Sequence, residues 1–202
     1  MLRCLRHATD PDHLAAVTTL VASDGRRARR ARALGLAWGA GHATSLFAFG
    51  VPIVLARSYL PDAAHELAET AVGVMIAALA VRLLVRWRRG GLHAGRADAA
   101  RGRSLPAAYG IGLVHGMGGS AGVGVLLLAS IPDHLLAVIA LVVFAAGTAV
   151  CMSLASGGFG AVLASGAVAR RLPVVAPALA VGSFAFGSWY ALRALQAVPY
   201  VL

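Results

Sequence analysis

Charged residues are scarce in this sequence. Only 13% of its 202 residues are Asp, Glu, Lys or Arg, whereas 59% are hydrophobic and the mean hydropathy is +0.77. Soluble domains carry about 25% charged residues, so this composition excludes an ordinary soluble domain. It predicts an integral membrane protein that is embedded in a lipid bilayer.

Lysine is absent, and all 18 basic residues are arginine. The formal net charge of +10 would by itself be compatible with nucleic-acid binding. The arginines, however, cluster between apolar runs, whereas a nucleic-acid-binding domain gathers its basic residues on one folded face. We therefore predict no nucleic-acid partner.

Several familiar motifs are also missing. The two cysteines, Cys4 and Cys151, form neither a C-x-x-C pattern nor a disulfide framework. The chain has no Walker nucleotide motif and no H-E-x-x-H protease motif. No cleavable signal peptide is expected, because the polar residues 7–13 interrupt the first apolar stretch. We predict a protein that is not an enzyme and has no permanently bound cofactor.

Six apolar stretches approach the ~20 residues that a helix needs to cross a bilayer. They predict a single all-α transmembrane domain over residues 1–202, with spans at about 2–22, 33–56, 67–86, 105–130, 135–156 and 173–197. The first stretch is barely long enough and the most polar. Within it, Asp10 and Pro11 have the pattern of an N-cap and a first helical residue, so we expect this helix to be broken there.

Arginine is concentrated in alternate loops. The loops 23–32, 87–104 and 157–172 contain arginines, whereas the other two loops hold a single one. The positive-inside rule places these three loops in the cytoplasm and both termini outside, in the inner membrane of a bacterium. Residues 157–172 are mixed in composition and are expected to form a loop with a re-entrant or interfacial segment.

A weak internal repeat is visible. Residues 38–46 can be aligned with residues 144–152, which would divide the six spans into two halves of three. An odd number of spans per half inverts one half relative to the other, as in many secondary transporters. Coincidence in an alanine- and glycine-rich chain is the alternative explanation. Small residues such as Gly35 and Gly39 predict close helix packing in either case.

The most polar part of an apolar span contains His7, Asp10, Asp12 and His13. Ionisable groups within a membrane are costly, so several together indicate a bound cation or an ion pathway. At a broken helix, the end of the first half and the carboxylates would both favour a cation. Asp10 either ligates the ion or caps the second half-helix, and we favour capping.

Two further histidines lie deep within predicted spans. His42 follows Gly41 in the second span, and His115 precedes Gly116 in the fourth. Each is a candidate ligand or pathway residue, and the alternative is a histidine that hydrogen-bonds to a neighbouring helix. Weak oxygen ligands or supporting hydrogen bonds are expected from Thr44, Ser45 and Ser120.

The remaining polar residues have ordinary explanations. His65, His93 and His134 fall in loops or at span ends, where a solvated histidine is expected. Glu66 and Glu69 begin the third span, where acidic side chains complement the helix dipole.

Imidazole nitrogen and carboxylate oxygen together suit Ni²⁺ or Co²⁺. The segment His7 to His13 resembles the H-x4-D-H signature of the nickel/cobalt transporter family. Residues 41–44 resemble the G-H-S/A-T motif of that family, and residues 115–120 resemble the H-G-x-x-G-S stretch of its small six-helix branch of nickel permeases and urease-accessory-like membrane proteins. The L-G-F-D-T-A-T-E motif of the larger members is absent.

The resemblance implies that His7, Asp12 and His13 bind the metal and that His42 joins the site or lines the path. The sequence therefore predicts a permease that moves Ni²⁺, and also Co²⁺, into the cell. Efflux through the same site is an alternative, although the loop 87–104 offers only His93, which favours uptake. A membrane haem or redox subunit with His42 and His115 as axial ligands and an intramembrane metalloprotease are rivals from other classes. Oligomeric state and a metallochaperone partner are left open.

Overall fold

The computed structural model describes residues 15–16, 28–56, 62–89, 104–118 and 130–195. These residues form an all-helical structure, as predicted. Its five helices are α3 (Ala28–Ala56), α4 (Asp62–Arg88), α5 (Leu105–His115), α7 (His134–Ala164) and α8 (Gly166–Ala194). Of these, α3, α4, α7 and α8 are each long and apolar enough to cross a membrane.

The fourth predicted span, 105–130, is wrong as one continuous helix. Helix α5 ends at His115, and Gly116 closes it by donating its backbone N–H to the carbonyl of Gly112 at 2.9 Å. Met117 then donates to the Val114 carbonyl at 3.3 Å, which tightens the last turn. The sequence 116–119 is Gly-Met-Gly-Gly, and glycine is a poor helix former because it loses more backbone freedom than any other residue.

The predicted loop at 157–172 is also wrong. Helix α7 continues to Ala164 and α8 begins at Gly166, so only Ser165 interrupts the helical path. The Ser165 backbone N–H donates to the carbonyls of Ala161 and Val162 at 3.1 Å, and the Ser165 hydroxyl donates to the Val162 carbonyl at 2.7 Å. The alanine content of this stretch supports helix despite its glycines, because alanine has the highest helix propensity.

Two further helices extend beyond their predicted spans. Helix α3 begins within the predicted loop 23–32, and α4 extends beyond the predicted span 67–86 at both ends. The first predicted span, with its break at Asp10 and Pro11, lies outside the described residues, as does the second half of span four. The described part of the chain therefore does not support a count of six helices or a 3+3 repeat.

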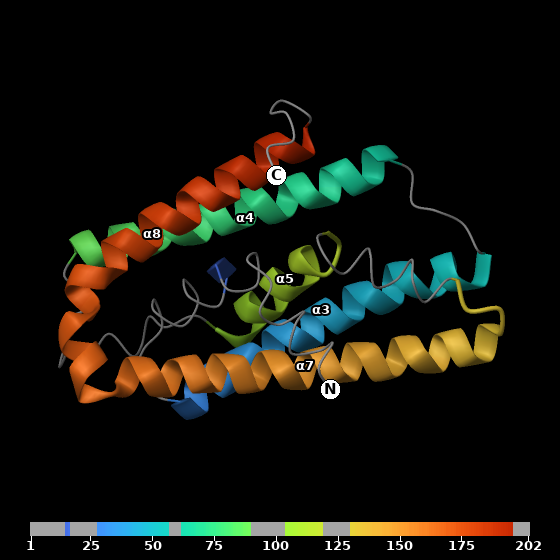
Figure 1. Ribbon diagram of the computed structural model, residues 1–202, viewed down its shortest axis with the longest axis horizontal. Coiled ribbons are helices and arrows are strands. Elements are labelled where there is room, and N and C mark those ends of the chain that lie inside the picture. Colours follow the sequence, from blue (N-terminus) through green and yellow to red (C-terminus); the bar gives the residue numbers. More distant parts are fainter. Residues whose placement is uncertain (1–14, 17–27, 57–61, 90–103, 119–129, 196–202) are drawn as a thin grey trace.

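Two antiparallel helix pairs make up most of the bundle (Figure 1). In the first, α3 packs along α7 at glycines: a Cβ added to Gly35 would lie 2.5 Å from Ser156 Oγ, and one added to Gly39 would lie 2.6 Å from the Ala149 Cα. Any side chain at these positions would separate the helices. The close packing predicted from the small residues is confirmed here.

The second pair, α4 and α8, meets at two facing glycines. A Cβ on Gly73 would lie 2.7 Å from the Gly187 carbonyl oxygen, and a Cβ on Gly187 would lie 2.7 Å from that of Gly73. A buried cluster that includes Trp38 of α3, Leu83 of α4 and Ala180 of α8 joins the two pairs. Helix α5 contributes Ala108 to the same cluster.

The outward faces of the long helices are apolar. Large hydrophobic side chains such as Leu67, Leu135 and Val174 are more than two-thirds exposed. In water so much exposed apolar surface would promote association, whereas a helix that contacts lipid presents such a surface.

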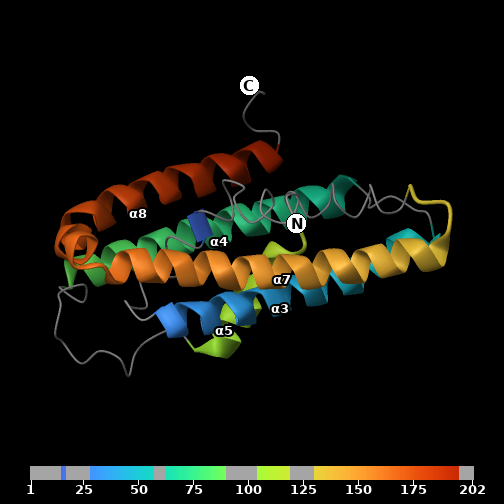
Figure 2. The same cartoon turned by 60° about the horizontal axis from the view of Figure 1, so that its bottom comes forward.

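Most of the described arginines lie near helix ends on one side of the bundle. The start of α3, the end of α4 and the junction of α7 and α8 lie at one end of the bundle in both views (Figures 1 and 2). The described arginines near these ends are Arg29, Arg30, Arg32, Arg86, Arg88, Arg89 and Arg171. The opposite end carries the start of α4, with His65 and Glu66, Asp133 at the start of α7, and Arg193 in the last turn of α8. The fold thus gathers arginines from loops that are distant in sequence.

Candidate metal site

Two histidines meet where α3 crosses α5. His42 lies in the middle of α3 and His115 is the last residue of α5, and both side chains are 0% exposed. Their ring centroids are 6.1 Å apart, with the ring planes inclined by 50°. The sequence identified each histidine separately as a candidate ligand or pathway residue, and the tertiary structure brings the two together.

Glycines allow the two helices to approach closely beside these histidines. A Cβ on Gly112 would collide with the Trp38 carbonyl oxygen, and a Cβ on Gly41 would collide with that of Tyr109. A Cβ on Gly116 would lie 2.6 Å from the His42 carbonyl oxygen. The backbones of α3 and α5 are therefore in direct contact at the level of both imidazoles.

Ser45 and Trp38 hold the arrangement in place. The Ser45 hydroxyl is 3% exposed and donates to the Leu113 carbonyl at 2.6 Å, which ties α3 to the last turn of α5. The ring of Trp38 meets that of His115 edge-on, with centroids 5.4 Å apart. Trp38 was not predicted as a site residue, although its spacing of four from His42 places both on one face of α3.

Thr44 lies apart from the buried pair. It is exposed, its hydroxyl donates to the Ala40 carbonyl at 2.9 Å, and it accepts a hydrogen bond from the Tyr109 hydroxyl at 3.0 Å. Two positions along a helix rotate a side chain by about 200°, so Thr44 points away from the direction taken by His42.

The other predicted site residues, His7, Asp10, Asp12, His13 and Ser120, lie outside the described residues. Within the part of the chain that the structure describes, no group of three His, Cys, Asp or Glu side chains is placed to hold a metal ion. The described portion of the candidate site is therefore a histidine pair.

The end of α5 adds an electrostatic contribution. The last carbonyls of a helix carry partial negative charge, equivalent in total to about half an elementary charge. Because α5 ends at His115, this charge lies beside the imidazoles. Imidazole nitrogens next to a helix C-terminus form an environment that favours a cation.

A comparison with curated proteins finds one relevant similarity. The chain is 25% identical over 157 residues to the urease accessory protein UreH of Bacillus sp. (strain TB-90), and the matched region covers 73% of this chain and 68% of that protein. No family model matches the chain, and no solved structure matches it.

Proposed function

We propose that this protein is a permease that moves Ni²⁺, with Co²⁺ as a second substrate, into the bacterial cell across its inner membrane. The observation that carries the proposal is the meeting of His42 and His115, both fully buried, on helices of a strongly apolar bundle. Buried ionisable groups in such helices mark ion pathways more often than structural contacts.

The geometry of the pair is compatible with a shared ion. Two imidazoles that bind one metal through bonds of ~2.1 Å have ring centroids roughly 5 to 6.5 Å apart, and these centroids are 6.1 Å apart. Imidazole is a ligand that Ni²⁺ and Co²⁺ accept readily. In this proposal His7, Asp12 and His13 complete the ligand set, and Asp10 caps the second part of a broken first helix.

The distant similarity to a urease accessory protein supports nickel as the substrate. Urease is a nickel enzyme, and a membrane protein that assists urease would supply nickel to it. The present chain would supply the ion by transport and not by catalysis.

We further propose a six-span architecture with an inverted repeat. In such a repeat α3 would correspond to α7 and α4 to α8, and these are the pairs that pack antiparallel (Figure 1). Corresponding helices related by a two-fold axis in the membrane plane would meet in this way.

The charge distribution supports the proposed orientation. The arginine-bearing end would face the cytoplasm, which places both termini outside. A membrane potential that is negative inside would then favour entry of a divalent cation by about 4.6 kcal/mol per 100 mV, twice the value for one charge.

The haem alternative fits the helix packing less well. A porphyrin between His42 and His115 would need a slot between α3 and α5, but Gly112 and Gly116 bring those two backbones into contact beside the imidazoles. Efflux remains the alternative within the transporter class, because the same ligands serve either direction.

The decisive experiment measures radiolabelled Ni²⁺ in cells that express the wild-type protein, His13→Ala, His42→Ala or His115→Ala. Loss of a ligand should lower the initial uptake rate by at least about tenfold at low Ni²⁺. The control is His134→Ala, which removes an exposed histidine at the start of α7, with equal membrane abundance checked by immunoblot.

Equal uptake by all the variants would overturn the metal-site proposal. Faster loss of Ni²⁺ from preloaded cells that express the wild-type protein, without faster entry, would establish efflux instead.

A further inference from the structure

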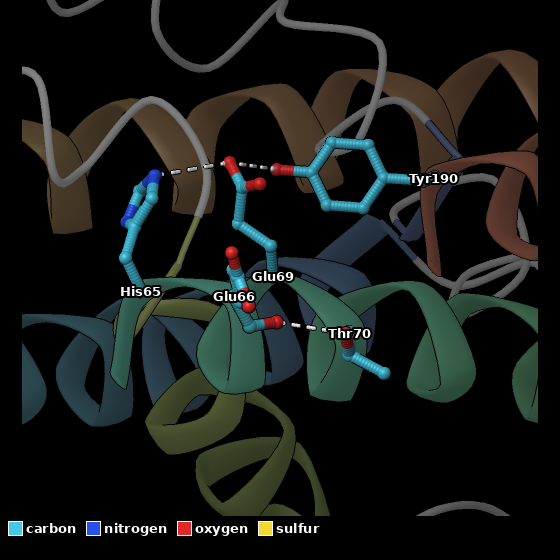
Figure 3. A network of polar contacts seen from close by, with 5 residues as sticks. All are labelled: His65, Glu66, Glu69, Thr70 and Tyr190. Carbon is cyan, nitrogen blue, oxygen red and sulfur yellow. Dashed lines mark hydrogen bonds and ion pairs between the residues drawn. The ribbon is translucent and has the colours of Figure 1, made fainter. Parts of the chain in front are cut away.

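A second group of metal-binding side chains lies away from the histidine pair. His65 and Glu69 are one helical turn apart on α4, and His65 Nε2 is 3.5 Å from Glu69 Oε1. The two side chains are 46% and 28% exposed. Figure 3 shows the carboxylate of Glu69 between the imidazole of His65 and the phenol of Tyr190.

The carboxylate is held from a second helix. The Tyr190 hydroxyl on α8 donates to Glu69 Oε1 at 3.4 Å, across a separation of 121 positions in the sequence. The hydroxyl of Thr70 donates instead to the backbone carbonyl of Glu66 at 2.7 Å. The hydrogen bond from Tyr190 on α8 thus orients Glu69 toward His65. An ordinary pair of solvated surface side chains has no such contact with a second helix.

The position of this group relates it to the buried histidines. Shortly after His115 the chain reaches Gly118, which touches the backbone of α4 at Ala68 and Glu69: an added Cβ would lie 3.0 Å from the Ala68 carbonyl oxygen and 3.1 Å from the Glu69 nitrogen. The segment that leaves the buried pair therefore crosses α4 at Glu69. This part of α4 lies at the end of the bundle opposite the arginine-rich end (Figure 1).

We infer that His65 and Glu69 form an entry site that captures a divalent first-row cation before it reaches His42 and His115. Two atoms that bind one ion through bonds of ~2.1 Å lie roughly 3.0 to 3.4 Å apart, close to the 3.5 Å observed between Nε2 and Oε1. The imidazole and carboxylate pair matches the ligand preference of Ni²⁺ and Co²⁺. This inference rests on the proposed transport function. It assigns the first step of transport, in which the cation is captured at the outer end of the bundle, to His65 and Glu69.

Two protein ligands suit an entry site. Among the described residues no third His, Cys, Asp or Glu joins them in a metal-binding arrangement. In this inference, water completes the coordination. An ion on a transport path must bind strongly enough to enter and weakly enough to leave. Tyr190 acts as a positioning residue, because it orients the carboxylate as hydrogen bonds commonly do around metal ligands.

The binding experiment uses the purified full-length chain in lipid nanodiscs and Co²⁺ as the probe, because ligated Co²⁺ absorbs visible light. His7→Ala, His13→Ala, His42→Ala and His115→Ala are present throughout, so that the imidazoles of the proposed inner site do not contribute. Adding His65→Gln and Glu69→Gln should lower the Co²⁺ affinity at least tenfold, whereas adding His134→Gln, an exposed histidine at the same end, should not. Equal Co²⁺ affinity with and without the His65 and Glu69 substitutions would overturn the inference.

A second measurement needs no substitution at the site. In the wild-type protein, saturating Ni²⁺ should slow the modification of His65 by diethyl pyrocarbonate several-fold, as followed by mass spectrometry, and leave His134 unchanged. Equal modification of His65 with and without Ni²⁺ would contradict metal binding there.

A transport measurement separates the two proposals. His65→Gln with Glu69→Gln should raise the KM for Ni²⁺ uptake about tenfold and leave the maximal rate near that of the wild type, and Tyr190→Phe should raise KM by a smaller factor. An unchanged KM in the double variant would overturn the role in entry. If the wild-type protein binds Co²⁺ at His65 and Glu69 but moves no Ni²⁺, the proposed function fails while the cation site stands.

Discussion

Gly112 on α5 lies directly against the backbone carbonyl of Trp38 on α3, so that even a methyl group at position 112 would collide with it. This contact lies within one turn of both His42 and His115 and sets the distance between their helices. The histidine pair therefore depends on a residue that has no side chain.

Gly112→Ala should separate α3 from α5 and lower the free energy of unfolding by about 1–3 kcal/mol, the usual cost of overpacking. Nickel uptake should fall with it, because the imidazoles move apart. Gly110→Ala is the matched control on the same helix, since an added Cβ there meets nothing within 4 Å. Thermal denaturation in detergent and uptake in cells would check both variants, and equal behaviour of the two would contradict this account of the packing.

Ser45→Ala should weaken the connection between α3 and α5, because it removes the buried hydrogen bond to the Leu113 carbonyl. We expect a loss of about 0.5–1.5 kcal/mol in stability and a reduced rate of Ni²⁺ uptake. Ser45→Thr, which retains the hydroxyl, tests whether the hydrogen bond rather than the side-chain volume is responsible.

Thr44→Val should leave the affinity for Ni²⁺ unchanged, because Thr44 is exposed and its hydroxyl is engaged by Ala40 and Tyr109. The KM of uptake is the measurement. A large rise in KM would show that Thr44 takes part in the path, as the sequence alone had suggested.

Removing the metal should lower the thermal stability of the wild-type protein. A ligand that binds only the folded state stabilises it by about 2.7 kcal/mol at a concentration one hundred times its Kd. Adding Ni²⁺ should therefore raise Tm, and a chelator should reverse the change. The combined variant His42→Ala and His115→Ala should show a much smaller rise, and a full rise in that variant would place the metal elsewhere.

The proposed orientation can be tested with single cysteines in a variant in which Cys4 and Cys151 are replaced by alanine. A membrane-impermeant maleimide added to intact spheroplasts should label Ala63→Cys, near the start of α4, and should not label Arg89→Cys until the membrane is opened. The reverse pattern would place the arginine-bearing end outside.

The sequence by itself determined the helical, membrane-compatible character of this chain, the arginine-rich segments and the position of His42 and His115 within apolar runs. These properties follow from composition, from the length of apolar runs and from the cost of burying an imidazole, all of which are local. Helix boundaries were harder to predict, because Gly116 and Gly118 follow the end of α5 whereas Gly157, Gly158 and Gly160 lie within α7.

Only the tertiary structure decided which residues meet. Gly41, Gly112 and Gly116 bring His42 beside His115, and no local pattern shows which backbone a given glycine will face. The same holds for Glu69, which the sequence identified as an ordinary residue at a helix start and which the fold sets between His65 and Tyr190. Contacts between helices depend on the packing of segments that are far apart in the chain, and this information is not contained in any one of them.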